Sequence, residues 1–206
     1  MALFPAFLKL AGRHCVVVGA GRTAEGKILG LLQTGAEIRV IAPKATPRIR
    51  GWARANKIRW DARPFRASDL SRAFLVVAAT SVPALHAKIY AQARQRGILC
   101  NVVDDPPHCN FYYGAVVRRG ALQIAISTEG HSPALAQRLK QKIAAEFVPQ
   151  YGSWLAEIGK LRRKILGEKK LSPARRKAAL RRLASAESFR EFRRRAKRKR
   201  SRKAHS

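Results

Sequence analysis

Two adjacent carboxylates, Asp104 and Asp105, lie in the short stretch CNVVDDPPHCNF at residues 100–111 and could transfer protons. Asp104 directly follows an apolar, strand-like run, and a partly desolvated carboxylate in that position suits general-base chemistry. Asp105 precedes a proline and is typical of a solvent-facing turn in which Asp caps backbone groups. We therefore predict Asp104 as the catalytic carboxylate and Asp105 as part of the turn that aims it.

The same stretch offers groups that could bind a metal ion, namely the thiols of Cys100 and Cys109 and the imidazole of His108. Their spacing matches neither C-x-x-C nor another four-ligand pattern, and Cys100 should point into a sheet. We predict no fixed metal site, while transient contact of iron with His108 or Asp104 stays open.

A glycine turn, GAGRTAEGK, offers a different chemistry. Gly19, Gly21 and Ala24 fit the G-x-G-x-x-G/A pattern, and the turn follows an apolar run and opens a helix, where that pattern must lie. Gly19 permits the tight turn, Gly21 lets a pyrophosphate approach backbone N–H groups, and Ala24 allows close helix–strand packing. The turn therefore favours nucleotide binding over a purely structural role.

The ribose end of such a cofactor is less clearly specified. The second strand ends VIAPK, without the Asp or Glu that would bond the ribose hydroxyls. Pro43 and Lys44 stand there instead, and Lys44 or Arg22 could favour a 2′-phosphate, so these residues leave NAD and NADP open. Thr80 and Ser81 end the fourth strand and should line the same cleft.

Alternating strands and helices would bring these residues to one edge of a sheet, and the apolar pattern predicts that alternation. The strands are almost wholly apolar, as expected for a parallel sheet covered on both faces. Residues 1–112 are thus predicted to form a Rossmann-like, doubly wound α/β domain. Strands are expected at 14–20, 37–43, 57–64, 74–80 and 98–104, with helices after the first, second and fourth.

The pattern changes beyond residue 112. Residues 113–148 predict a small α+β segment, with two strands over 114–128 and a helix over 131–147 that has Ser132 as its N-cap. Residues 149–190 are expected to be helical, and residues 191–206 to form a basic, disordered tail.

Charge narrows the classes of partner. The formal net charge is +31, and residues 160–206 alone hold 21 Lys/Arg against 3 Asp/Glu. Such a chain attracts polyanions, whether nucleic acid, an anionic membrane surface or a multiply carboxylated metabolite. An odd count of cysteines and the lack of a long apolar segment predict reduced thiols, no membrane span and a cytoplasmic protein.

Several motifs occur in a familiar order: FPAFLKLAGRHCVVVGAGRTAEGK, the AP after the second strand, VVAAT, CNVVDDPPHCNF and RGALQIAISTEGHSPALAQRL. Together they resemble the precorrin-2 dehydrogenase/sirohydrochlorin ferrochelatase family, the NAD-dependent domain of siroheme synthases. The likeness covers roughly residues 4–165, with the chain resembling the form that has no fused methyltransferase.

The resemblance implies that NAD⁺ accepts a hydride from precorrin-2 to give sirohydrochlorin, and that some members then insert Fe²⁺ to give siroheme. The family's key carboxylate falls on Asp104. Its nucleotide contacts fall on Arg22, Thr23, Pro43 and Lys44. The resemblance also implies a homodimer, with the central segment supplying the dimer contacts.

Substrate contacts are expected in the segment after residue 112. The family's serine/threonine pair falls on Ser127 and Thr128, which could bind a substrate carboxylate or cap the next helix. Many members have Gly where this chain has Glu129, which adds a negative charge beside the cleft. Because precorrin-2 carries many carboxylates, basic side chains are further candidates to hold it: Arg118, Arg119, His131 and Arg138.

A second hypothesis belongs to another class: a nucleotide-sensing regulator or nucleic-acid-binding protein. The basic residues 193–203 would supply its phosphate contacts. The tail contains no recognised reading motif, so non-specific contact with a polyanion is the form that its composition supports.

Overall fold

The computed structural model describes the backbone of residues 2–203 and the side chains of residues 2–198. The chain divides after Tyr112, with residues 3–112 forming one compact unit and the chain from Tyr113 onward another.

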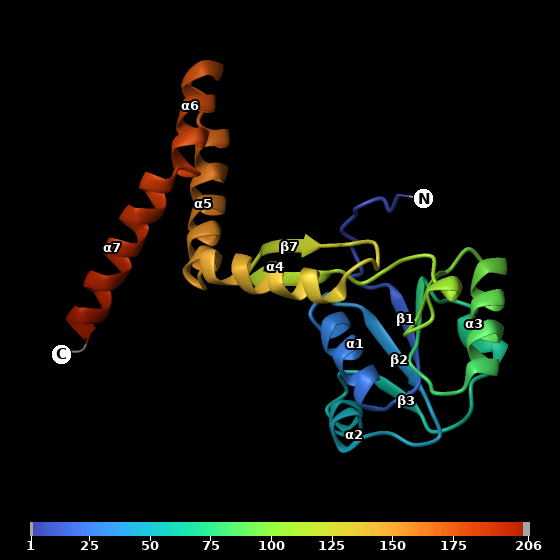
Figure 1. Ribbon diagram of the computed structural model, residues 1–206. Coiled ribbons are helices and arrows are strands. Elements are labelled where there is room, and N and C mark those ends of the chain that lie inside the picture. The colour runs from blue at the N-terminus through green and yellow to red at the C-terminus, as the bar shows by residue number, and fades with distance from the viewer. Residues whose placement is uncertain (1, 204–206) are drawn as a thin grey trace. The chain divides into compact units, whose positions relative to one another are not determined.

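A five-stranded parallel sheet forms the centre of the first unit (Figure 1). Its order, β3-β2-β1-β4-β5, places β1 in the middle, so the chain moves outward to β3 and then crosses back to β4. The crossing creates a switch point beside β1, where ligands bind in doubly wound sheets. The strands are β1 His14–Val18, β2 Glu37–Ile41, β3 Arg59–Asp61, β4 Leu75–Ala78 and β5 Leu99–Val102.

Helices cover both faces of this sheet, which explains its apolar strands. Figure 1 shows α1 and α2 on one face and α3 on the other. In β1, Cys15 and Val17 pack in the core that includes α1 and α2, whereas Val16 and Val18 pack in the core that includes α3. The prediction of a doubly wound α/β fold is confirmed. The helical elements are α1 Arg22–Leu32, α2 Pro47–Arg54, η1 Ala67–Leu70, α3 Pro83–Gln95 and η2 Pro106–His108.

The second unit begins with an antiparallel pair, β6 Ala115–Arg119 and β7 Leu122–Ile126. Gly120 makes the turn between them with φ +58°. Helix α4, Pro133–Glu146, follows, and the Ser132 hydroxyl accepts a hydrogen bond from Leu135 N at 3.2 Å, which is the predicted N-cap. The chain ends in three helices, α5 Gln150–Gly167, α6 Pro173–Leu183 and α7 Ala186–Lys203.

Helix α7 corrects one expectation. Residues 191–203 are helical rather than disordered, and residues 204–206 lie outside the described residues. Several contacts hold α7 to α5; among them, the Phe189 ring lies 4.2 Å from that of Tyr151, and Arg195 bonds Glu157 at 2.7 Å. Arg, Lys and Ala are also strong helix formers, so packing at one end stabilises a segment whose charge alone favours disorder.

Candidate functional site

A cleft of about 620 Å³ lies at the carboxyl ends of the strands in the first unit. It is the place where the switch-point rule puts a nucleotide. The predicted residues that line it are Gly19, Gly21, Thr23, Pro43, Thr80, Ser81 and Asp104. Arg22 and Lys44 are exposed and do not belong to its lining. The loops after β1, β2, β4 and β5 therefore converge on one cavity.

An apolar wall of this cleft was missed from the sequence. Pro64 and Phe65 follow β3, and Val82 and Leu85 lie at the start of α3. The only sequence signal for these residues is their position, because each stands after a strand or at a helix start, where the cleft of such a sheet must lie. An apolar wall with a few polar groups is the usual lining of a cofactor site.

The glycine turn is fixed by neighbouring strands. Gly19 has φ +105° and donates from its N–H to the Ile41 carbonyl oxygen at 2.9 Å. Gly21 precedes α1 and has no side chain to cap the helix, and a Cβ built on it would meet nothing within 4 Å. The first N–H groups of α1 thus border open space, as a bound pyrophosphate requires.

The nearby charges also suit a dinucleotide. Glu25 lies in the first turn of α1, and Arg48 on α2 faces its carboxylate at 3.7 Å, which offsets this negative charge. Pro43, rather than an acid, borders the cleft after β2. The cavity, its glycine turn and the uncapped helix together fit the pyrophosphate of a nicotinamide dinucleotide.

Asp104 lies just beyond β5 with φ +59°, a left-handed conformation that reverses the direction of the chain. Its side chain borders the cleft and is exposed, so the expectation of a partly desolvated carboxylate is wrong. Lys27, half-buried on α1, lies close enough to Asp104 for the two charges to interact. Burial lowers the pKa of Lys27, while the charges of Asp104 and Cys109 oppose that shift. Lys27 was not identified as a site residue from the sequence.

Asp105 is the more buried carboxylate, and the prediction that it faces solvent is also wrong. Its oxygens lie 2.9 Å from Nδ1 of His108 and 3.2 Å from Nδ1 of His86 on α3. The hydrogen bond from His108, aided by that from His86, lowers the pKa of Asp105. The η2 turn folds this carboxylate back toward α3.

Cys109 has a structural environment. Its Sγ accepts a hydrogen bond from Val102 N and donates to Val102 O, both at 3.2 Å. Neither His108 nor Cys109 lines the cleft. Among residues 2–203, no group of three or more His, Cys, Asp and Glu side chains is placed to hold a metal ion.

Residues predicted to hold the substrate lie in the second unit. Arg118, Ser127, His131 and Arg138 are exposed there. Thr128 is half-buried, and its Oγ1 donates to Ser132 O at 3.1 Å, which supports the capping alternative for this residue. Glu129 has a left-handed backbone with φ +51°.

Arg119 has a clear structural role. Its guanidinium donates to Phe147 O at 2.6 Å and to Ala144 O at 2.8 Å. These carbonyl groups lie at the end of α4, so Arg119 caps that helix. The expectation that Arg119 holds a substrate carboxylate therefore has a competing structural explanation.

Comparisons with known proteins decide the family. The family model described as "Putative NAD(P)-binding" matches residues 6–115, and "Sirohaem biosynthesis protein central" matches residues 119–146. The chain belongs to the siroheme-synthase NAD(P)-binding family. The resemblance found in the sequence is thereby confirmed, as is the expectation of a nicotinamide cofactor.

The names of similar curated proteins agree with this family assignment. A siroheme synthase of Neisseria meningitidis serogroup C is 38% identical over 177 residues, which are 86% of this chain and 37% of that protein. Siroheme synthase 1 of Serratia proteamaculans is 36% identical over 79% of this chain and 34% of its own length. The chain thus spans little more than a third of these curated relatives.

A solved structure extends the comparison. "SirC, precorrin-2 dehydrogenase" matches with a TM-score of 0.73 and 27% identity, and the match covers 95% of this chain and 100% of that one. None of the helices in the described part of this chain is long and apolar enough to cross a membrane.

Proposed function

We propose that this protein oxidises precorrin-2 to sirohydrochlorin with NAD⁺ as the hydride acceptor. The observation that carries the proposal is the cleft that gathers the glycine turn and Asp104 in one cavity of about 620 Å³. The likeness to SirC over nearly the whole chain supports the same substrate. The reaction removes a hydride and a proton from precorrin-2 and gives sirohydrochlorin, NADH and a free proton.

The chain's own residues bind the cofactor and manage the proton. NAD⁺, when bound, would accept the hydride. The N–H groups that follow Gly21 hold the pyrophosphate, and Thr80 and Ser81 border the side of the cleft next to β5. Asp104, on the adjacent loop, accepts the proton that precorrin-2 loses. The exposure of Asp104 leaves this carboxylate accessible to a substrate as large as a tetrapyrrole.

Substrate recognition follows from charge. The carboxylates of precorrin-2 are matched by basic and hydroxyl groups of the second unit, namely the exposed Arg118, Ser127, His131 and Arg138 and the half-buried Thr128. Guanidinium groups bind carboxylates with two parallel hydrogen bonds, which favours the two arginines over the other members of this set.

Anaerobic turnover tests the proposal directly. Purified protein is incubated with precorrin-2 and NAD⁺, and NADH is followed by absorbance. NADH that appears in proportion to sirohydrochlorin supports the proposal. Cofactor that binds in calorimetry without any turnover of precorrin-2 would refute the assigned activity while retaining a nucleotide site.

Three accompanying expectations remain predictions: insertion of Fe²⁺ into sirohydrochlorin, a homodimer and a cytoplasmic location. Each has its own measurement. Fe²⁺ added anaerobically to sirohydrochlorin with the protein tests chelation by the appearance of the siroheme spectrum. Sedimentation tests the dimer, and fractionation of cells tests the location.

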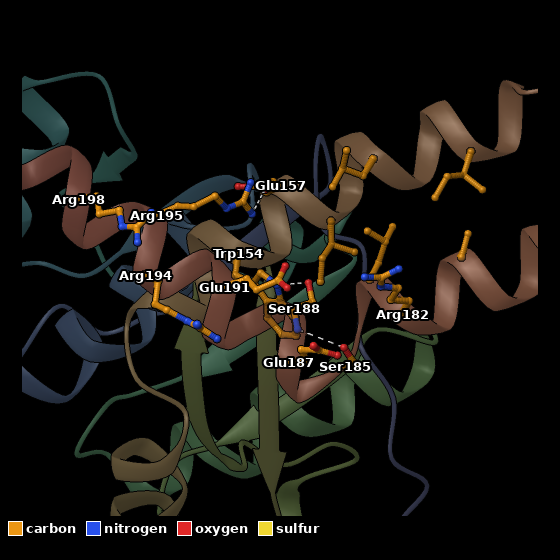
Figure 2. Close-up of a pocket in the computed structure, with 15 residues that line it drawn as sticks. Trp154, Glu157, Arg182, Ser185, Glu187, Ser188, Glu191, Arg194, Arg195 and Arg198 are labelled. Carbon is orange, nitrogen blue, oxygen red and sulfur yellow. Dashed lines mark hydrogen bonds and ion pairs between the residues drawn. The ribbon is translucent and has the colours of Figure 1, made fainter.

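We also propose a second, non-specific function for α7, which is contact with duplex nucleic acid. Arg190, Arg193 and Arg194 are exposed on this helix at three- and four-residue spacing, so they share one face. Figure 2 shows Arg194, Arg195 and Arg198 beside a hollow of about 700 Å³ between the C-terminal helices. The phosphate groups of a nucleic acid carry the negative charge that these arginines would bind.

The aromatic residues of this region favour a duplex over a membrane or a single strand. The rings of Phe189 and Trp154 lie 5.0 Å apart, and Tyr151 contacts both. Rings packed against one another have fewer free faces with which to stack on bases or insert among lipid chains. What α7 presents outward is charge, which suits the regular phosphate backbone of a duplex.

Fluorescence anisotropy with a labelled duplex tests this second function. Arg190→Glu/Arg194→Glu should weaken binding and reduce the slope of log K against log[salt] by about 0.9 for each lost phosphate contact. The control Arg54→Glu/Lys57→Glu makes the same change of charge on the first unit. Equal losses in the two variants, or tighter binding to anionic vesicles than to duplex, would contradict the assignment.

A further inference from the structure

His86 has an oxygen atom opposite each of its two ring nitrogens. Nε2 lies 2.8 Å from the carbonyl oxygen of Thr80, and Nδ1 lies 3.2 Å from Oδ2 of Asp105. The side chain is only 12% exposed, so the protein rather than water supplies both partners. No signal in the sequence marked this histidine, which is one of the α3 residues next to the cleft.

The two contacts together specify the protonation state of His86. A carbonyl oxygen and a carboxylate can only accept, so each ring nitrogen must donate for both hydrogen bonds to exist. A neutral imidazole has one N–H and can make only one of these bonds. Both bonds therefore require the imidazolium, which Asp105 balances with its negative charge.

The two oxygen atoms belong to different loops of the cofactor cleft. Thr80 lies in the loop between β4 and α3, and its neighbour Ser81 also lines the cleft. Asp105 directly follows Asp104 in the loop between β5 and η2. His86 is thus a bridge between the polar groups at the ends of two adjacent strands.

We propose that His86, as an imidazolium, is a positioning residue that ties these two loops together and so sets Asp104 opposite the cofactor. The proposal rests on the proposed function for the meaning of that position, but the bridge itself is a property of the first unit alone. His86 touches neither cofactor nor substrate in this role. It acts through Thr80 and Asp105.

The groups around His86 favour this charge state. Of the elements packed against α3, the η2 region contributes Asp105 and His108, and η1 contributes Asp69, whose carboxylate is bonded to Arg63. Strand β5 contributes the neutral thiol of Cys100, and β4, with the sequence LVVA, has no titratable side chain. Within α3, Lys88 and Tyr90 are the near neighbours along the chain.

His108 does not require the same charge. Its Nδ1 faces both oxygens of Asp105 at 2.9 Å, so a neutral ring with its proton on Nδ1 satisfies that contact. Asp105 therefore accepts from one charged and one neutral imidazole.

Loss of the proton should loosen the cleft. A neutral ring has a single N–H, so one of the two bonds to His86 is lost when the imidazolium gives up its proton. We expect NAD⁺ affinity to weaken about fivefold on this change, which is the effect of one net hydrogen bond. The turnover number should fall as well, because Asp104 loses its fixed position.

Nuclear magnetic resonance of the ring nitrogens tests the bridge without any ligand. At about pH 6 both nitrogens of His86 should carry protons, and raising the pH should convert it to a ring with one N–H. Calorimetry with NAD⁺ over the same pH range should show weaker binding in step with that titration. Coincidence of the two curves is the expected result.

His86→Gln supplies the matched test of affinity. A glutamine amide has no titrating proton, so this variant should bind NAD⁺ about fivefold more weakly than the native protein at pH 6 and show no dependence on pH through the imidazole range. His14→Gln is the control, because His14 pairs with Glu37 at 3.0 Å in an exposed position outside the cleft. The control should behave as the native protein.

Asp105→Asn gives a second test if His86→Gln folds poorly. Asparagine retains an acceptor but removes the charge that balances the imidazolium, so the bridge should be weaker and NAD⁺ affinity at pH 6 should fall. A single protonated nitrogen on His86 at pH 6, or unchanged pH dependence in His86→Gln, would overturn the inference. A native protein that binds no NAD⁺ would instead refute the proposed function, and the ring titration would still decide the bridge.

Discussion

Gly19 lies so close to Ala79 that a Cβ atom on this glycine would stand 2.2 Å from the Ala79 carbonyl oxygen. The two residues follow adjacent strands, β1 and β4, and Gly19 adopts φ +105°. Both the left-handed backbone and the contact exclude any side chain. The glycine turn is therefore fixed by packing against the backbone as well as by its role beside a cofactor.

Gly19→Ala should destabilise the protein, because the backbone of Ala79, just after β4, would have to move. We expect a loss of at least about 2 kcal/mol in the free energy of unfolding, measured with urea. Gly26→Ala is the matched control, since a Cβ there meets nothing within 4 Å inside α1. That change should be neutral or stabilise the protein by up to about 1 kcal/mol.

Gly21→Ala should give the opposite pattern, with a stable fold and weak cofactor binding. A Cβ at Gly21 meets no protein atom within 4 Å, but it enters the space next to the first turn of α1. We expect NAD⁺ affinity to fall at least about tenfold, as a pyrophosphate is pushed away from the N–H groups. Calorimetry would measure this, and an unchanged affinity would place the pyrophosphate elsewhere.

Asp104→Asn should remove turnover while retaining NAD⁺ binding. Asparagine fills the same volume and tolerates the φ of +59°, but it cannot accept a proton as a base. The turnover number should fall at least about a hundredfold. Glu37→Gln, a change of an exposed carboxylate outside the cleft, should leave the rate unaltered. Full activity of Asp104→Asn would show that another group accepts the proton.

Acid should weaken the first unit through the pair Asp69 and Arg63, whose atoms approach to 2.6 Å. Burial alone would raise the pKa of Asp69, but hydrogen bonds from Arg63 and from Arg66 N–H outweigh burial and lower it. Because the folded-state pKa is the lower one, this pair stabilises the fold above the ordinary Asp value of about 4. Its contribution is lost as the pH falls through the lowered value.

Urea unfolding at several pH values measures that loss. Asp69→Asn should cost about 3 kcal/mol at pH 7, since Asp69 is only 3% exposed and Arg63 would lose its shorter ion pair and keep only that with Asp61 at 3.3 Å. Below about pH 4 the native protein should lose more stability per pH step than Asp69→Asn does. Parallel curves for the two proteins would mean that other carboxyl groups dominate acid unfolding. Glu146→Gln, at an exposed site, controls for net charge.

The three cysteines should react slowly with thiol reagents in the native state. Burial raises the pKa of Cys15 to about 11 and that of Cys100 to about 12, with the charge of Cys109 adding to the latter shift. Burial also raises the pKa of Cys109. At pH 8 these groups remain thiols, so modification by iodoacetamide should become fast only after unfolding. Rapid labelling of Cys109 would reveal opening of the η2 loop.

The sequence was sufficient for the glycine turn and for four of the five strands, because the apolar runs at β1, β2, β4 and β5 correspond to largely buried strands. Strand β3 is shorter than expected and partly exposed. The sequence was also sufficient to place Asp104 and Thr80 at the ends of adjacent strands. Both depend on short-range pattern and on the geometry of parallel sheets. The helical conformation of residues 191–203 was missed, since the charge of this segment hides the packing of α7 on α5 through Phe189.

The relative burial of Asp104 and Asp105 could not be predicted. It depends on the left-handed backbone at Asp104 and on the approach of His86, which lies 19 positions before Asp105. A contact of this kind arises only when α3 and the η2 loop have packed. Lys27 was missed for the same reason, because its relation to Asp104 joins α1 to a loop far along the chain.

All residues that line the cleft come from one uninterrupted segment, residues 3–112. Such a segment can be exchanged between genes as one piece, because recombination beyond Tyr112 leaves every cleft residue in place. Different downstream sequences can then be joined to the same cofactor site without redesigning it.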